Sequence, residues 1–274
     1  MNRTPVRTTS LREKKRRGEK IVMLTAYDAT IARLLDHAGV DALLVGDSLG
    51  MVALGYTSTL PVTLDMMVHH TSAVSRGVEH ALVIADMPFL SYQVTVEEAV
   101  RNAGRLIQEA GAAAVKIEGG RPMLDVIRRL VDIGIPVMGH LGLLPQSVHQ
   151  LGGYGRRATE PREADALLAD AVALEEAGAF AIVLESIPAA LAAAVTTRVG
   201  VPTIGIGAGP DCDGQVLVSS DMLGLIERVP PFVRQYAHLA ETIARAAEQY
   251  AEDVRAGRFP AVGAPVAGTP ATST

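Results

Sequence analysis

The sequence is poor in cysteine and in aromatic residues. Its 274 residues include one cysteine, Cys212, and no tryptophan, and aromatic residues make up 4% of the chain. A single cysteine excludes an intramolecular disulfide and a thiolate metal cluster. Cys212 has no visible partner in the sequence, and we interpret it as non-catalytic. The small aromatic share means that the core has to be built from aliphatic side chains.

Basic charge is also scarce. The formal net charge is −5, and the only dense basic run spans residues 12–17. Nucleic-acid binding needs a basic face, so we expect no nucleic-acid partner, and we interpret this run as the solvent-exposed face of an N-terminal helix. Lysine occurs only at positions 14, 15, 20 and 116, in a chain that otherwise uses arginine. The identity of Lys116 is therefore informative, because lysine and arginine differ in size, pKa tuning and nucleophilicity.

Long hydrophobic runs are absent as well. The apolar run that follows the basic N-terminus, residues 21–27, is too short for a signal peptide or a membrane span. We therefore expect no membrane partner and a cytoplasmic location. The hydrophobic fraction of 49% suits a large buried core, and the length allows one or two domains.

Eight short apolar runs alternate with segments of helical periodicity. The predicted strands are residues 21–27, 42–47, 82–86, 114–118, 137–140, 180–185, 203–206 and 215–219. Continuous apolar runs separated by helices are typical of parallel strands covered by helices. We predict an α/β protein, a single-domain (β/α)8 TIM barrel over residues 1–257, with a helix over 11–18 before the first strand. Residues 258–274 are rich in Pro, Ala, Gly and Thr and are predicted to form a flexible tail. A doubly wound open sheet is the alternative.

Four of these strands deliver an acidic residue at their C-terminal end. Asp47, Asp86, Glu118 and Glu185 complete the second, third, fourth and sixth runs. In a barrel the C-terminal strand ends meet at one face, where active sites lie, so we expect one site assembled from all four acids. Ion-paired barrel residues or helix caps would be the interpretation for any one of them alone.

The residue types in this set indicate a particular chemistry. Carboxylate oxygens without cysteine favour Mg2+, which keeps several waters and admits a chelating substrate, so Asp47, Asp86 and Glu118 are candidate ligands. Lys116 lies two residues before Glu118 on the same face of a strand, and either pairs with Glu118 or supplies a cation for an anionic substrate. Glu185 has no obvious cation nearby and is a candidate general acid or base, or an acid at the start of the next helix.

Three further features have weaker signals. Ser48 follows Asp47, and its hydroxyl and amide could hold a carboxylate or serve the turn alone. His140 ends the fifth strand, and we interpret it as a residue that supports the ligands rather than one of them. Residues 205–209, Gly-Ile-Gly-Ala-Gly, have the wrong spacing for a dinucleotide-binding motif and favour close backbone approach at the barrel mouth.

Six short motifs, in this order, together resemble the ketopantoate hydroxymethyltransferase family. They are Thr25-Ala-Tyr-Asp28, Gly46-Asp-Ser-Leu-Gly-Met51, Ala85-Asp-Met-Pro88, Val115-Lys-Ile-Glu-Gly119, Gly139-His-Leu-Gly142 and Gly205-Ile-Gly-Ala-Gly209. The resemblance implies a (β/α)8 barrel that transfers a hydroxymethyl group from 5,10-methylenetetrahydrofolate to 3-methyl-2-oxobutanoate. The product would be 2-dehydropantoate, in pantothenate biosynthesis.

The resemblance also implies roles for single residues and a homo-oligomer, a decamer. Mg2+ would be associated with Asp47, Asp86 and Glu118. The oxo acid would contact Asp47, Ser48, Asp86 and Lys116, and Glu185 would be the catalytic base. Our hypothesis is that Mg2+ chelates the oxo acid and stabilises the enolate at C3, which attacks the one-carbon unit.

Other functions remain open at this point. Lys116 could be a Schiff-base nucleophile, as in metal-independent aldolases. The chain could instead be a Mg2+-dependent lyase or mutase of the phosphoenolpyruvate-like barrel group that acts on a 2-oxo acid. A catalytically inactive barrel that serves as an assembly subunit belongs to a different class again.

Overall fold

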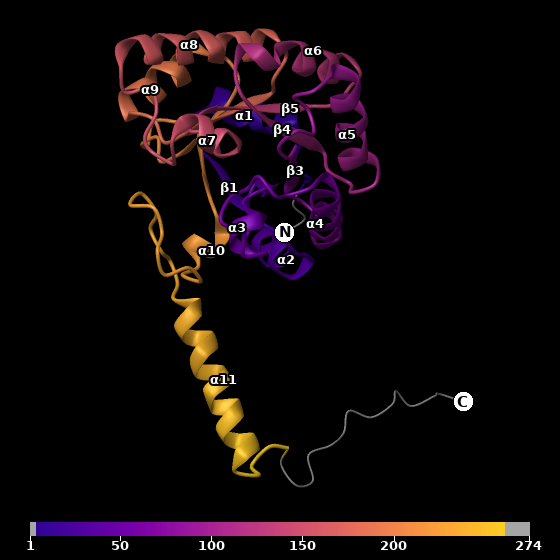
Figure 1. Ribbon diagram of the computed structural model, residues 1–274, viewed down its shortest axis with the longest axis vertical. Helices are drawn as coiled ribbons and strands as arrows, with labels where there is room; N and C mark the ends of the chain where they lie inside the picture. The colour runs from indigo at the N-terminus through magenta and orange to yellow at the C-terminus, as the bar shows by residue number, and fades with distance from the viewer. Residues whose placement is uncertain (1–3, 261–274) are drawn as a thin grey trace, which may run out of the picture. The chain divides into compact units, whose positions relative to one another are not determined.

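The structure, a computed structural model, describes residues 4–260 and contains a closed barrel of eight parallel strands (Figure 1). Each strand pairs with its neighbours in the sequence, and β1 pairs with β8 to close the barrel. The strands are β1 (Ile21–Thr25), β2 (Ala42–Val45), β3 (Leu82–Asp86), β4 (Ala114–Glu118), β5 (Val137–Gly142), β6 (Ala181–Glu185), β7 (Thr203–Ile206) and β8 (Gly214–Leu217). The predicted (β/α)8 barrel is confirmed, and the open doubly wound sheet is excluded.

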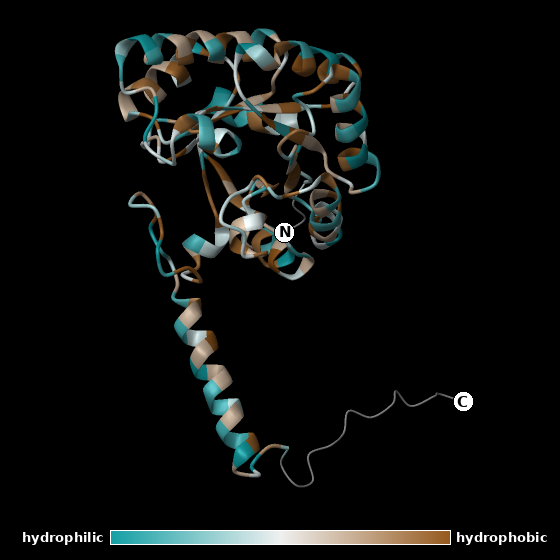
Figure 2. Cartoon of the chain, viewed as in Figure 1, coloured by the Kyte–Doolittle hydropathy of each residue, from teal (hydrophilic) through white to brown (hydrophobic). Residues whose placement is uncertain are grey.

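Helices follow most of the strands and carry hydrophilic residues on their outer faces, whereas the strands are largely hydrophobic (Figure 2). The α-helices are α1 (Thr8–Arg17), α2 (Ala29–Ala38), α3 (Leu49–Val52), α4 (Leu64–Gly77), α5 (Val96–Gln108), α6 (Leu124–Asp132), α7 (Val148–Leu151), α8 (Pro161–Glu176), α9 (Ala189–Arg198), α10 (Ser219–Met222) and α11 (Leu239–Arg255). Two 3-10 turns are η1 (Arg121–Met123) and η2 (Pro145–Ser147). Within residues 4–260 no helix is long and apolar enough to cross a membrane, and the cytoplasmic location stays a prediction.

Side-chain caps fix where two of the barrel helices begin. The Asp28 carboxylate accepts hydrogen bonds from the backbone N–H groups of Thr30 and Ile31, at 2.8 and 2.9 Å. The Thr95 hydroxyl accepts one from the Glu98 N–H at 3.1 Å. The first turn of a helix leaves these N–H groups unpaired, and such a cap contributes about 1 kcal/mol. The caps set the ends of the loops that follow β1 and β3 at the C-terminal face of the barrel.

Helix α1 closes the N-terminal end of the barrel. Its Leu11 is fully buried and belongs to the same apolar cluster as the inward-facing strand residues. Lys14 pairs with Asp41 at 2.8 Å and Lys15 pairs with Asp213 at 2.9 Å. The interpretation of the basic run as a solvent-exposed face is therefore wrong for these two lysines, whose ammonium groups attach α1 to the barrel.

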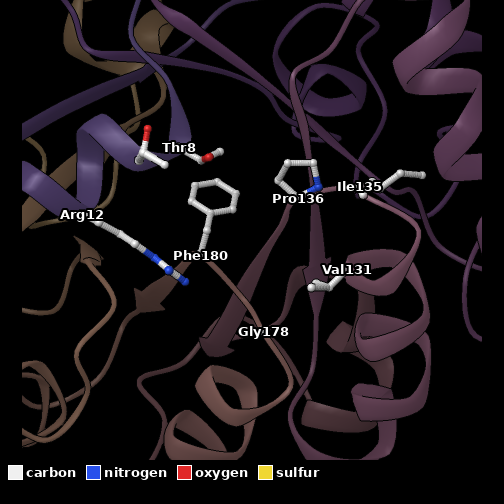
Figure 3. A pocket seen from close by; sticks show the side chains of 9 residues that line it. Thr8, Arg12, Val131, Ile135, Pro136, Gly178 and Phe180 are labelled. Carbon is white, nitrogen blue, oxygen red and sulfur yellow. The ribbon is translucent and has the colours of Figure 1, made fainter.

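A pocket of about 230 Å3 lies beside α1, where β5 and β6 begin (Figure 3). It is lined by Thr8, Thr9, Arg12, Val131, Gly134, Ile135, Pro136, Gly178 and Phe180. Pro136 directly precedes β5 and Phe180 directly precedes β6, so the pocket is at the opposite end of the barrel from the acidic residues that complete β3, β4 and β6.

Residues from Ser220 onward form a second compact unit, described as far as residue 260. Its helix α11 buries none of its residues. The ring of Phe259, just after this helix, meets the edge of the Tyr250 ring at a centroid distance of 5.3 Å. The predicted flexible tail lies, apart from residues 258–260, outside the described residues, and a single domain over 1–257 stays a prediction.

Candidate active site

Strand alternation and register gather the charged residues inside the barrel. Along β4, Val115 and Ile117 pack in the outer cluster with the helices, whereas Ala114 belongs to the inner cluster, so Lys116 and Glu118 point inward. Inter-strand pairing places Lys116 opposite Asp86, and Glu118 opposite His140. All four of these side chains are buried. The predicted residues of β3, β4 and β5 therefore form one group at the C-terminal end of the barrel.

Asp47 joins this group through a turn rather than a strand. Strand β2 ends at Val45, two residues earlier than predicted, and Asp47 lies in the turn that leads into α3. Its backbone N–H donates to Asp86 Oδ2 at 3.0 Å. A Cβ atom at Gly46 would lie 2.7 Å from the Ser48 hydroxyl oxygen, so a larger residue there would displace the Ser48 side chain next to Asp47.

Lys116 pairs with Asp86 and not with Glu118, its neighbour along the strand. The Lys116 ammonium lies 3.0 Å from Asp86 Oδ1 and 3.2 Å from His140 Nδ1. Burial acts to lower the pKa of Lys116, but the Asp86, Glu118 and Asp47 carboxylates outweigh it and raise that pKa. A Schiff base needs a neutral amine, so this environment argues against Lys116 as a nucleophile.

The carboxylates of Asp47 and Asp86 are held in an environment that disfavours their charge. Burial, followed by the Asp86 and Glu118 carboxylates, raises the pKa of Asp47 well above its usual range. Burial also raises the pKa of Asp86, although the Lys116 ammonium opposes this. Asp86 Oδ1 is buried and receives no hydrogen bond from residues 4–260, so its only compensation is the ion pair with Lys116. Adjacent buried carboxylates of this kind fit a divalent cation.

The site does not already present three side chains arranged as metal ligands. In the described part of the chain, no three His, Cys, Asp or Glu side chains are grouped closely enough to hold a metal ion. Glu118 Oε2 instead accepts the backbone N–H of Gln146 at 3.1 Å. Asp47 and Asp86 are thus the pair that suits a cation best, and Glu118 as a third ligand stays a prediction.

His140 connects the buried group to Glu185. Its Nδ1 lies 3.6 Å from Glu118 Oε1, and its Nε2 lies 3.2 Å from Glu185 Oε2. Burial and Lys116 act to lower the pKa of His140, but hydrogen bonding to Glu118 and Glu185 raises it overall. The sequence showed no cation beside Glu185, and the structure supplies one in His140 when that ring is protonated. The Glu185 side chain retains 19% exposure, so it lies at the open edge of the site.

Comparison with known proteins adds an independent observation. Residues 5–262 match the sequence model of the ketopantoate hydroxymethyltransferase family. The chain belongs to that family. A 3-methyl-2-oxobutanoate hydroxymethyltransferase of Thermosynechococcus vestitus is 58% identical to it, over 95% of this chain and 100% of the relative. One of Acaryochloris marina is 61% identical, over 91% of this chain and 97% of the relative.

Solved structures with low sequence identity share the fold. A 2,3-dimethylmalate lyase, described as a PEP mutase/isocitrate lyase superfamily member, has a TM-score of 0.60 and 21% identity, covering 96% of this chain and 91% of its own. A phosphonopyruvate hydrolase solved with oxalate and Mg2+ has a TM-score of 0.61 and 15% identity, covering 95% and 92%. At these identities the likeness shows the barrel fold alone.

In this member of the hydroxymethyltransferase family, two residues of the site gave no signal in the sequence. Gln146, from η2 after β5, donates its side-chain amide to Asp47 Oδ2 at 2.9 Å. Tyr92, from the loop after β3, donates its hydroxyl to Gln146 Oε1 at 2.8 Å. Both lie in loops without periodicity, and only their position after a strand places them at the C-terminal face.

Ser48 and Gly209, two of the remaining predicted features of this family member, lie around the same face, whereas Cys212 lies in the loop just before β8, toward the opposite end of the barrel. The Ser48 hydroxyl is 2.9 Å from that of Tyr27, next to Asp47. Gly209 has a φ of +82°, and a Cβ there would lie 2.5 Å from that of Ala189, so the glycine permits the predicted close approach. Cys212 is buried, and burial raises the pKa of its thiol.

Proposed function

We propose that the chain transfers a hydroxymethyl group from 5,10-methylenetetrahydrofolate to 3-methyl-2-oxobutanoate and forms 2-dehydropantoate. The proposal is supported by the family, by relatives named 3-methyl-2-oxobutanoate hydroxymethyltransferase, and by one observation above all. That observation is a buried ammonium, Lys116, set among the carboxylates of Asp47, Asp86 and Glu118 at the C-terminal end of the barrel. Such a charged, sequestered cluster suits a small anionic substrate that has to be held and activated.

The charge balance of this cluster calls for a divalent cation. When the carboxylates of Asp47, Asp86 and Glu118 are all ionised, they face one ammonium, Lys116, so three negative charges against one positive leave two uncompensated. An oxo acid anion would be repelled by that excess, and a divalent cation cancels it. We infer Mg2+, held by Asp47 and Asp86 with Glu118 as a further ligand, because hard oxygen donors suit it. When bound there, Mg2+ would polarise the carbonyl of the oxo acid and stabilise the enolate.

The residues around the cluster then hold and orient the substrate. Lys116 stays charged and offers its ammonium to the substrate anion, while its ion pair with Asp86 at 3.0 Å fixes its position. Ser48 lies beside Asp47, and its hydroxyl, paired with Tyr27, is available to the carboxylate of the oxo acid.

Glu185 is the proposed catalytic base. Its Oε2 faces His140 Nε2 at 3.2 Å, which orients the carboxylate at the open edge of the site and leaves the other oxygen to move a proton at C3 or at the one-carbon unit. His140 in turn is held by Lys116 and Glu118, so Glu185 is linked to the buried group without being part of it. Loss of a general acid–base group costs about 10²–10⁴ in rate.

A substrate panel tests the proposed function. Purified full-length protein is incubated with 3-methyl-2-oxobutanoate and Mg2+, with and without 5,10-methylenetetrahydrofolate, and the products are followed by mass spectrometry. We expect 2-dehydropantoate only when the folate and the oxo acid are both present. Cleavage or rearrangement of 2-oxo acids without folate would indicate the lyase or mutase alternative. A borohydride-trapped adduct on Lys116 would indicate the Schiff-base alternative, and no turnover of any substrate would indicate an assembly subunit.

We further propose that the chain forms a homo-oligomer, for which the resemblance implies a decamer. Helix α11 carries an apolar stripe at helical spacing, Leu239, Ile243, Tyr250 and Val254, and buries none of its residues. An exposed stripe of this length needs a partner surface, and a second copy of the chain is one that is always present. Light scattering should give a mass of several chains, and Ile243→Glu should lower it. A monomeric wild-type protein would contradict this part of the proposal.

A further inference from the structure

Gln146 is a buried polar residue to which no role has been given so far. It lies in η2, in the loop after β5, and is 5% exposed. From there it contacts residues that end three other strands. Its side-chain amide donates to Asp47 Oδ2, after β2, and to Met87 O, after β3, both at 2.9 Å. Its backbone N–H donates to Glu118 Oε2, at the end of β4, at 3.1 Å.

The surroundings of the Gln146 amide allow only one orientation. Asp47 Oδ2 and Met87 O are both acceptors, so the NH2 group has to face them. On the other side, the Tyr92 hydroxyl donates to Gln146 Oε1 at 2.8 Å, with Glu118 O at 3.3 Å as a longer second acceptor, and it accepts the Glu118 N–H at 3.2 Å. The amide of Gln93 also donates to Gln146 Oε1, at 3.3 Å. All donor and acceptor positions of the amide are therefore used, and it cannot rotate without losing several hydrogen bonds.

The two donors of Gln146 act on one oxygen of each carboxylate. The side-chain amide donates to Asp47 Oδ2, and the backbone N–H donates to Glu118 Oε2. No hydrogen bond from residues 4–260 reaches Asp47 Oδ1, whereas Glu118 Oε1 lies 3.6 Å from His140 Nδ1. Gln146 thus fixes one oxygen of each carboxylate; Asp47 Oδ1 remains to meet a ligand, whereas Glu118 Oε1 is shared with His140. Residues that hydrogen-bond to metal ligands without binding the metal themselves commonly orient those ligands.

We propose that Gln146 is a positioning residue that orients the Asp47 and Glu118 carboxylates for a divalent cation. The inference rests on the proposed function, because it assumes that these carboxylates hold Mg2+. Gln146 itself touches neither the cation nor the substrate; it acts through the two acids. Its side-chain amide orients the Asp47 carboxylate. Its backbone N–H would continue to hold the Glu118 carboxylate in any side-chain variant.

Magnesium titration of the metal-stripped, full-length protein tests the inference. Gln146→Met keeps the side-chain length and removes both amide donors, and isothermal calorimetry with MgCl2 alone measures the dissociation constant. Loss of a residue that orients a metal ligand typically costs 10–100-fold in affinity, so we expect the Mg2+ dissociation constant to rise by about that factor. Gln215→Met is the matched control, because the exposed Gln215 amide donates to Gly209 O and, among residues 4–260, to no carboxylate. Its affinity should equal that of the wild type.

Two further measurements separate positioning from a merely structural role. Urea midpoints of the metal-free proteins report on folding; a lower midpoint with an unchanged Mg2+ affinity would overturn the inference, as would tighter binding by Gln146→Met. If Gln146→Met does not fold, Gln146→Asn keeps the polar group but ends one methylene short of Asp47, and its affinity should fall in the same direction or the inference is wrong. If the wild type itself neither binds Mg2+ nor forms 2-dehydropantoate, the proposed function fails instead.

Discussion

Replacing Lys116 by methionine should destabilise the metal-free protein in a way that a second substitution repairs. The Lys116 ammonium and the Asp86 carboxylate are 3.0 Å apart, and their side chains are 6% and 5% exposed. Removing one partner of a buried pair costs about 3–5 kcal/mol, because the other charge remains without compensation. Burial already raises the pKa of Asp86, so this carboxylate can take up a proton when its partner is lost. We therefore expect the free energy of unfolding of Lys116→Met to fall by about 3 kcal/mol at neutral pH, at the lower end of that range.

The assay is a double-mutant cycle. Urea unfolding followed by circular dichroism, in metal-free buffer, compares the wild type with Lys116→Met, Asp86→Asn and the double variant. Asp86→Asn keeps the shape of the side chain and removes its charge, so the double variant should be more stable than Lys116→Met alone. The deficit of Lys116→Met should also grow as the pH rises, since an orphaned carboxylate with a raised folded-state pKa opposes folding once it has to ionise. Strictly additive losses, or a loss below about 1 kcal/mol for Lys116→Met, would refute the reasoning.

Three other predictions concern single residues. Glu185→Gln should lower kcat by a factor of about 10²–10⁴ and leave the Mg2+ dissociation constant nearly unchanged. Asp86→Asn, in contrast, should weaken Mg2+ binding. An equal loss of Mg2+ affinity in the two variants would place Glu185 among the metal ligands. The metal-free wild type should become less stable as the pH rises above the unfolded-state pKa of aspartate, about 3.9, because the folded-state pKa of Asp47 is raised. Melting curves recorded at several pH values should show a weaker dependence of the melting temperature on pH for Asp47→Asn than for the wild type. Leu11→Ala, which removes the fully buried side chain under the barrel, should cost about 2–5 kcal/mol in urea unfolding.

The barrel and the strand-end acids could be predicted from the sequence because both follow from local patterns. Asp86, Glu118 and Glu185 each complete an apolar run, and parallel strands in a barrel bring such ends to one face. That rule needs only the strand positions, so small errors in the predicted strand ends do not change which acids reach the site. Asp47 illustrates this, because it lies two residues beyond β2 and still reaches the group through the turn.

The pairing within the site could not be predicted in the same way. Lys116 lies nearer in sequence to Glu118 than to Asp86, and only the register between β3 and β4 sets it opposite Asp86. His140 lies opposite Val183 in the register of β5 and β6, and it meets Glu185, two residues further along β6, only through their side chains. Gln146 was missed because a loop after a strand has no periodicity, and its role depends on where the loop returns. Contacts between strands and loops are set by tertiary packing, which no local pattern records.

Proton exchange at C3 of 3-methyl-2-oxobutanoate tests the central claim, that this carboxylate cluster activates the oxo acid by means of Mg2+. The full-length protein is stripped of metal and incubated with the oxo acid in D2O without folate, and loss of the C3 proton signal is followed by NMR. We predict exchange that is negligible in EDTA and is restored when MgCl2 is added in excess. Exchange at full rate in the metal-free protein would contradict the account.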